Sequence, residues 1–380
     1  MITSGNLATG IRWSLRALAS AVALGVAVGC GDLRLPSSQP DETPIVKPHP
    51  LAEHVLVVVN NKSPDSLAIG EYYAKKRGIP ATNIVHVNCP PEEEVSRYEY
   101  YDLIEEPVAH RLHESRFTLD YLVTTKGIPL RIKNSGLSIN ALLAAIDLSD
   151  LQPPRTIDEQ SLKSLINPYF GKQEHFLHRD FKLFLTTRLD GYSLAAVKLM
   201  IDRSVEATAE KGLFFFAEAE NRRTGGFAAM QSTLGLANAK LQTKGLVSRI
   251  QTSGVFSAPT EELMGYASWG SNDGWFNADV YHKLKFKPGS IAQTFVSTSG
   301  RTFNHTTGGQ SLMADLIDQG CCGCAAYVSE PYVFSLNRPD ILFDRYTSGY
   351  NLAESFWMAS PILKWKEVIV GDPLCNPYGH

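Results

Sequence analysis

The chain has 380 residues, of which 44% are hydrophobic and 20% are charged, and its formal net charge is −3. These proportions are typical of a globular protein. The slightly negative charge gives no electrostatic basis for binding nucleic acid, so we expect no nucleic-acid partner. This length allows about two domains of ordinary size, or one large α/β domain.

The first 30 residues have the features of an export signal. Arg12 and Arg16 precede an apolar stretch, residues 17–29, that is too short to cross a bilayer comfortably. It ends in the letters AVGC at positions 27–30, which resemble the cleavage box of bacterial lipoproteins, although leucine is commoner at the first of these positions. We expect lipidation at Cys30, and hence an exported protein held on a membrane and facing the periplasm or the cell surface. An ordinary cleaved signal and a retained anchor are the alternatives.

The region after Cys30 predicts a tether followed by one large domain. Residues 31–50 are polar and rich in proline, which is typical of an extended linker. The domain is expected over residues 51–380. Its five cysteines are an odd number, which argues against a complete disulfide framework. Cys321, Cys322 and Cys324 lead into an apolar run and are interpreted as buried strand residues. Because no second ligand cluster accompanies them, we expect neither a metal ion nor a cofactor.

From residue 54 onward, apolar runs of strand length alternate with segments of helix length. This alternation predicts a three-layer α/β/α sandwich with a mostly parallel sheet. Residues 134–180 are less regular and are interpreted as an insertion with one helix, 138–146. The predicted strands are 54–59, 84–87, 120–125, 181–187, 212–216, 263–266, 291–296, 324–328 and 367–370, and the longer predicted helices end near residues 77, 113, 211, 245 and 319.

Polar residues follow most of the predicted strands. In open α/β sheets, ligands bind in the crevice outside the carboxyl ends of the strands, so several of these residues should converge. For any single residue, contact of the strand end with water is the simpler explanation. The residues expected to line the crevice are Asn60, Lys126, Arg188, Asp190, Ser268, Trp269, Ser271, Asn272, Ser299, Arg301 and Glu330.

Several segments, taken in chain order, resemble the gingipain-type branch of the caspase-like peptidases. They are residues 121–129 (YLVTTKGIP), 185–191 (LTTRLDG), 264–271 (MGYASWGS), 297–303 (STSGRTF) and 371–373 (GDP). The resemblance spans about residues 54–378 and implies a caspase-like fold. Residues 187–191 (TRLDG), 268–273 (SWGSND) and 328–332 (VSEPY) are also similar to a family of exported bacterial proteins from genomes with exosortase-type protein sorting. That second resemblance implies a cell-envelope context and no particular chemistry.

The resemblance also implies that the usual catalytic pair is missing. The catalytic histidine of the peptidases falls on Trp269 and their cysteine on Ser297. An indole cannot accept the proton, and a serine without a base is a weak nucleophile at neutral pH. His305, eight positions beyond Ser297, is a candidate surrogate base, although an exposed loop histidine is the simpler interpretation.

Carboxylates offer a second route to catalysis. Asp273 is a candidate for acid/base or metal chemistry together with Glu330 or Asp372. Turn formation and helix capping are the simpler roles for such residues. The leading hypothesis is therefore an exported protein that binds a peptide or a glycan, in a role linked to surface protein sorting, without cleaving it. The alternative is a hydrolase that uses Ser297 or the site carboxylates.

Overall fold

The computed structural model describes residues 47–115, 118–148, 158–252 and 254–379. The predicted export signal, Cys30 and residues 31–46 of the predicted tether lie outside these residues. None of the described helices combines the length and the apolar character needed to cross a membrane.

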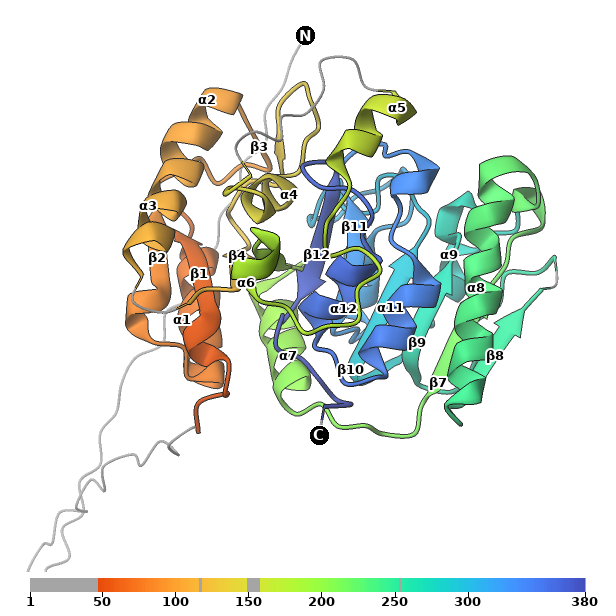
Figure 1. Ribbon diagram of the computed structural model, residues 1–380. Coiled ribbons are helices and arrows are strands. Elements are labelled where there is room, and N and C mark those ends of the chain that lie inside the picture. The colour runs from red at the N-terminus through yellow and green to blue at the C-terminus, as the bar shows by residue number, and fades with distance from the viewer. Residues whose placement is uncertain (1–46, 116–117, 149–157, 253, 380) are drawn as a thin grey trace, which may run out of the picture. The chain divides into compact units, whose positions relative to one another are not determined.

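A ten-stranded sheet forms the centre of the described part of the chain, in the order β2-β1-β4-β6-β12-β11-β10-β9-β7-β8 (Figure 1). A separate two-stranded sheet joins β3 (Glu94–Val95) to β5 (Arg131–Ile132). The strands of the large sheet are β1 (Val55–Asn60), β2 (Ile84–Val87), β4 (Tyr121–Thr125), β6 (Leu185–Leu189), β7 (Leu213–Ala217), β8 (Ser248–Gln251), β9 (Leu263–Ser268), β10 (Phe286–Thr294), β11 (Gly323–Tyr327) and β12 (Glu367–Gly371).

Most neighbouring strands of the large sheet are parallel. Strands β2, β1, β4 and β6 form one parallel group, and β11, β10, β9, β7 and β8 form another. Strand β12 lies between the groups and is antiparallel to β11 over five pairs. Among the described residues it pairs with β6 only through one parallel bridge, between Val370 and Arg188, a single contact that does not define the direction of the strand.

Loop contacts show which strand ends share an edge of the sheet. Lys126, directly after β4, donates to the carbonyl oxygen of Phe303 in the loop after β10, so both strands end at one edge. We call it the carboxyl edge. Asp372, directly after β12, forms an ion pair with Arg77, the last residue of α1 (Pro64–Arg77), which lies where β1 begins. Strand β12 therefore ends at the opposite edge.

Helices cover both faces of the sheet (Figure 1). The described helices beside α1 are α2 (Arg97–Tyr100), the π-helix η3 (Tyr101–Glu105), α3 (Glu106–Glu114), α4 (Ile139–Ala144), α5 (Glu159–Leu162), α6 (His178–Phe181), α7 (Leu194–Val205), α8 (Gly225–Thr243), α9 (Ala278–Tyr281), α10 (Met313–Asp318), α11 (Pro339–Tyr346) and α12 (Leu352–Ala359). Short 3-10 turns are η1 (Ala52–His54), η2 (Ala81–Asn83), η4 (Lys163–Leu165), η5 (Glu220–Arg222), η6 (Gly270–Asn272) and η7 (Val333–Ser335).

Strand β1 shows how the layers are built. Side chains alternate along a strand, so its residues contribute to two cores. Val57 and Val59 belong to the same buried cluster as Tyr73 of α1, whereas Leu56 belongs to the cluster of Val108 in α3. The prediction of a three-layer α/β/α sandwich with a mostly parallel sheet is confirmed.

The contact between α1 and β1 is close because of a glycine. A Cβ atom on Gly70 would lie 2.3 Å from Cγ1 of Val59. Helix α1 is otherwise framed as the sequence suggests, with the Ser63 hydroxyl accepting from the Ser66 amide at its start and Gly78 in the left-handed conformation at its end.

Candidate binding site at the carboxyl edge

Lys126 joins the ends of three strands at the carboxyl edge. Its ammonium group donates to Asp190 Oδ1 at 3.3 Å, to the Gly191 carbonyl at 2.9 Å and to the Phe303 carbonyl at 3.3 Å. The loops after β4, β6 and β10 are thus brought together. Because three acceptors surround the ammonium group, Lys126 holds the loops in place and is not free to bind a ligand.

Arg188, Asp190 and Asn60 form the buried base of this edge. Arg188 donates to Asp190 Oδ2 at 2.8 Å and to the Ile128 carbonyl at 2.6 Å, and both members of the ion pair are about 2% exposed. Asn60 is fully buried and donates to the Gly127 carbonyl at 2.8 Å. These three predicted crevice residues therefore support the loops and do not face a ligand.

The loop after β10 is fixed by groups from outside it. Oε1 of Glu93 accepts from Thr302 Oγ1 at 2.7 Å, from the Phe303 amide at 3.0 Å and from Asn304 Nδ2 at 3.1 Å. Arg301 spans the same loop and donates to the Gln310 carbonyl at 2.7 Å. Sequence analysis missed Glu93, because it lies in a polar turn 209 positions from Thr302 and no local pattern connects the two.

The loops after β9 and β10 are also linked to each other. The Ser311 amide donates to Ser271 Oγ at 3.0 Å, and the Ser271 amide donates to Ser311 Oγ at 3.2 Å. Gln310 donates to Asn272 Oδ1 at 3.0 Å and accepts from the amide and hydroxyl of Thr298. Ser271 and Asn272 thus lie in one polar network at the carboxyl edge.

Two of the predicted crevice residues are too deep to line a crevice. Ser268 is 1% exposed, and its hydroxyl accepts from the Gly270 amide at 3.0 Å. Ser299 is fully buried, and its hydroxyl has no partner among the described residues. Ser268 is the last residue of β9, and Ser299 lies in the loop after β10.

Trp269 is a core residue. It is 1% exposed, and its ring centroid lies 4.8 Å from that of Phe295 and 5.8 Å from that of Phe227, with the Arg222 guanidinium 5.4 Å from its ring. Its indole nitrogen has no hydrogen-bond partner among the described residues. Packing, rather than proton transfer, is the role that these contacts support.

Ser297 lacks an activating group in the structure. It is partly exposed, and within the described residues no hydrogen bond joins its hydroxyl to a histidine or a carboxylate. His305, the candidate surrogate base, is exposed and stacks on Tyr192 with ring centroids 4.0 Å apart. The hydroxyl of Tyr192 in turn donates to Asp315 Oδ1 at 2.6 Å.

The candidate carboxylates are dispersed. Asp273 is 8% exposed and accepts from the Trp275 amide at 2.9 Å, and its burial raises its pKa. Glu330 is exposed beyond β11. Asp372 is excluded from the carboxyl edge, because β12 runs the other way and carries it to Arg77 and Tyr73. The pairing of Asp372 with Asp273 or Glu330 is therefore wrong.

A surface beside Asp273 carries side chains that sequence analysis did not select. Trp275 is 58% exposed, and its indole nitrogen donates to Glu220 Oε2 at 3.3 Å. Asn221 accepts from the Gly274 amide at 3.1 Å, and Arg222 donates to the Asn272 carbonyl at 2.9 Å. The position of Trp275 two residues beyond a strand-end carboxylate was the available signal.

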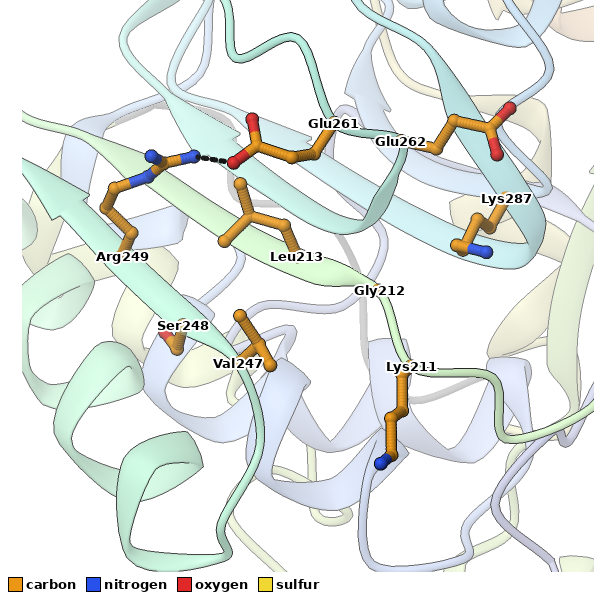
Figure 2. Close-up of a pocket in the computed structure, with 9 residues that line it drawn as sticks. All are labelled: Lys211, Gly212, Leu213, Val247, Ser248, Arg249, Glu261, Glu262 and Lys287. Atoms are coloured by element: carbon orange, nitrogen blue, oxygen red, sulfur yellow. Dashed lines mark hydrogen bonds and ion pairs between the residues drawn. The ribbon is translucent and has the colours of Figure 1, made fainter.

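A hollow of 420 Å³ lies at the other edge, where β7, β8, β9 and β10 begin (Figure 2). Leu213 and Val247 point into it, and charged side chains surround it. Arg249 pairs with Glu261 at 3.0 Å, and Lys287 pairs with Glu210 at 2.8 Å. The Ser248 hydroxyl donates to Asn238 Oδ1 at 2.6 Å, and no histidine or cysteine lies among the lining residues. We therefore do not take the hollow as the candidate site.

The five cysteines of the described region are unpaired and buried: Cys89, Cys321, Cys322, Cys324 and Cys375. Burial raises the pKa of each thiol, to about 12 for Cys89. Within residues 47–379, apart from the segments left undescribed, no group of three or more histidine, cysteine or acidic side chains is arranged to hold a metal ion.

No protein-family model matches the chain, and no curated protein matches it in sequence. A solved structure described as "Structure of Protease" is similar over 85% of this chain and 78% of its own, with a TM-score of 0.45 and 11% sequence identity. This distant likeness carries no argument about the chemistry of the chain.

Proposed function

We propose that this protein is an exported cell-envelope protein that uses the carboxyl edge of its sheet to bind a peptide or a glycan, and that it does not cleave what it binds. The observation that carries the proposal is the surroundings of Ser297. Its hydroxyl has no basic partner among the described residues, and Trp269, on which the resemblance places the catalytic histidine, is packed into the core. A serine nucleophile needs an adjacent base to react at neutral pH.

The rigidity of the edge supports a binding role. Glu93, Lys126 and Gln310 hold the loops after β4, β6, β9 and β10 through several hydrogen bonds each. A surface that is already ordered loses little conformational entropy when a ligand binds, and binding is correspondingly tighter. The envelope location rests on the sequence of residues 1–30, and the role in surface protein sorting rests on the resemblance of residues 187–191, 268–273 and 328–332 to exported proteins from genomes with exosortase-type sorting.

A fluorophosphonate probe, which phosphonylates activated serines with loss of fluoride, tests the proposal directly. We expect no labelling of the purified full-length protein above that of the Ser297→Ala variant, with trypsin as the positive control. Labelling of the wild type that disappears in Ser297→Ala would overturn the proposal in favour of a serine hydrolase. Hydrolysis of a labelled peptide or glycan that is lost in Asp273→Asn would overturn it in favour of a carboxylate mechanism.

A further inference from the structure

An exposed tryptophan, Trp275, lies in the loop after β9, and its indole nitrogen is hydrogen-bonded to a neighbouring segment. Trp275 exposes 58% of its surface, yet its amide donates to Asp273 at 2.9 Å and its indole nitrogen donates to Glu220 at 3.3 Å. A ligand that covers the apolar surface of such a ring gains free energy by removing that surface from water. The amide bond fixes the backbone of the turn, and the bond from the indole nitrogen links the ring to Glu220 while more than half of the residue faces solvent.

Polar groups with free hydrogen-bonding capacity surround this ring. Asp273 is 8% exposed, and its second carboxylate oxygen has no partner among the described residues. Asn221 and Arg222 are anchored to the same turn through Gly274 and Asn272. We call Glu220, Asn221, Arg222, Asp273 and Trp275 the Trp275 surface.

A second exposed ring flanks the turn. Phe227, at the start of α8, is 38% exposed, and the Arg222 guanidinium lies 4.8 Å from its ring centroid. Arg222 thus connects the Phe227 ring to the backbone of the turn that carries Trp275. The combination of apolar rings with carboxylate, amide and guanidinium groups defines the chemistry that this surface can recognise.

Pyranose sugars with equatorial hydroxyls match these features. Such a sugar has an apolar face of C–H groups that stacks on an aromatic ring, and a rim of hydroxyls that donate to carboxylates and accept from amides and guanidinium groups. We propose that the Trp275 surface is a saccharide-binding subsite that takes an oligosaccharide of such sugars. The inference rests on the proposed binding function, and of the two proposed ligands, a peptide or a glycan, it specifies the glycan.

The charges and the backbone both favour a sugar over a peptide. Two carboxylates, Glu220 and Asp273, are offset in part by Arg222, which suits an uncharged ligand better than a strongly charged one. An extended peptide would bind by adding a strand to an open sheet edge. The residues of the Trp275 surface lie in η5 and in the loop after β9, and neither of these described segments is an open edge strand available for such pairing.

Isothermal titration of the full-length protein with cellohexaose and with chitohexaose tests the inference. We expect at least one of the two to bind, and Trp275→Ala to weaken that binding by at least about 10-fold, the effect of losing ~1.4 kcal/mol. Trp275→Phe should retain more affinity than Trp275→Ala, because the apolar face remains. Tyr98→Ala is the matched control, since Tyr98 is 74% exposed on the distant helix α2.

The inference fails if neither oligosaccharide binds the wild type, or if Trp275→Ala binds as tightly as the wild type. Thermal unfolding of each variant shows whether it is folded. Glu220→Gln is a second variant, which keeps the Trp275 ring and should also bind the oligosaccharide more weakly than the wild type. This outcome is independent of the fluorophosphonate result at Ser297. A protein that is unlabelled and does not bind these sugars would therefore refute the saccharide subsite and leave non-catalytic peptide binding standing.

Discussion

His178, on α6, has a hydrogen-bond acceptor opposite each ring nitrogen. Nδ1 lies 2.5 Å from the Leu183 carbonyl oxygen, and Nε2 lies 3.0 Å from Asp147 Oδ2. A neutral imidazole donates from one nitrogen alone, so the charged ring alone satisfies both acceptors. Burial lowers the pKa of His178, but the hydrogen bonds to Asp147 and Leu183 outweigh it, and the pKa is raised overall.

The raised pKa predicts a pH-dependent contribution to stability. A histidine whose folded pKa exceeds its unfolded value of about 6.5 stabilises the fold fully below that value, and the stabilisation is lost as the pH rises through the folded pKa. We expect His178→Gln to lower the free energy of unfolding more at pH 5.5 than at pH 8.5. Urea denaturation of both proteins at the two pH values measures the difference.

The comparison needs the other titrating groups of this corner to stay constant. His113 and Asp120 are present in both proteins. The pKa of Asp147 is lowered chiefly by its hydrogen bond to His178, so Asp147 titrates at a more acidic pH than the histidine. A loss of stability in His178→Gln that is equal at the two pH values would contradict the prediction.

At the scale of elements, one buried ion pair ties the first helix to the last strand. Arg77 at the end of α1 donates to Asp372 after β12, and the Tyr73 hydroxyl donates to the same carboxylate at 2.7 Å. The side chains of Arg77 and Asp372 are 8% and 0% exposed. Because both side chains are buried, water cannot solvate either charge, and each charge is balanced by the other.

Removal of one charge from this pair should be costly. We expect Asp372→Asn to lower the free energy of unfolding by about 3–5 kcal/mol, because Arg77 would remain buried without a counter-ion. Lys76→Met is the matched control: Lys76 pairs with Asp202 at the surface, where both side chains are about a third exposed, and such pairs contribute about 0–1 kcal/mol. Equal losses in the two variants, measured by urea denaturation, would argue against the role assigned to Asp372.

The same elements show what the sequence could and could not predict. Helix α1 was predictable because capping residues and a terminal glycine frame it, and β1 and β4 were predictable because they are continuous buried runs. Helix α12 was missed because all eight of its residues are buried, so it has no polar face and no helical period. Strand β8 was missed because it is a partly exposed edge strand without an apolar pattern.

The candidate site was likewise predictable in part. The strand ends after β4, β6, β9 and β10 were identified, because polar residues after apolar runs are visible in the sequence. Which of those residues would be buried was not visible, since the burial of Arg188, Ser268 and Ser299 depends on loops far away in the chain. The direction of β12, which removes Asp372 from the edge, depends on long-range pairing and leaves no mark in a valine-rich run.

At the scale of the whole molecule, the predicted lipid anchor and the folded domain belong to different parts of the chain, so membrane attachment and folding should be independent. We propose acylation of Cys30, with residues 31–50 as a spacer between the membrane and the domain. Several acyl chains on one cysteine hold a protein stably, at about 0.8 kcal/mol per buried methylene. Attachment should therefore depend on this one thiol.

Replacement of that thiol tests the anchor. We expect Cys30→Ser to abolish incorporation of labelled palmitate and to release the protein from the membrane fraction, while the melting temperature of the folded domain stays the same. Fractionation and palmitate labelling of cells that express each form provide the measurement. An unlabelled wild type, with both forms in the same fraction at the same size, would favour an ordinary cleaved signal or a retained anchor.

The burial of the five thiols makes their reactivity depend on how often the domain unfolds. While the chain is folded, burial keeps these sulfur atoms protonated and out of reach, so oxidants and alkylating agents act on them slowly. Once the core opens, all five become reactive together. In an oxidising compartment, a molecule that folds late or reopens often accumulates irreversible sulfur damage that prevents its return to the native state. In such a compartment we therefore expect rare opening of the core to prolong the working lifetime of the protein.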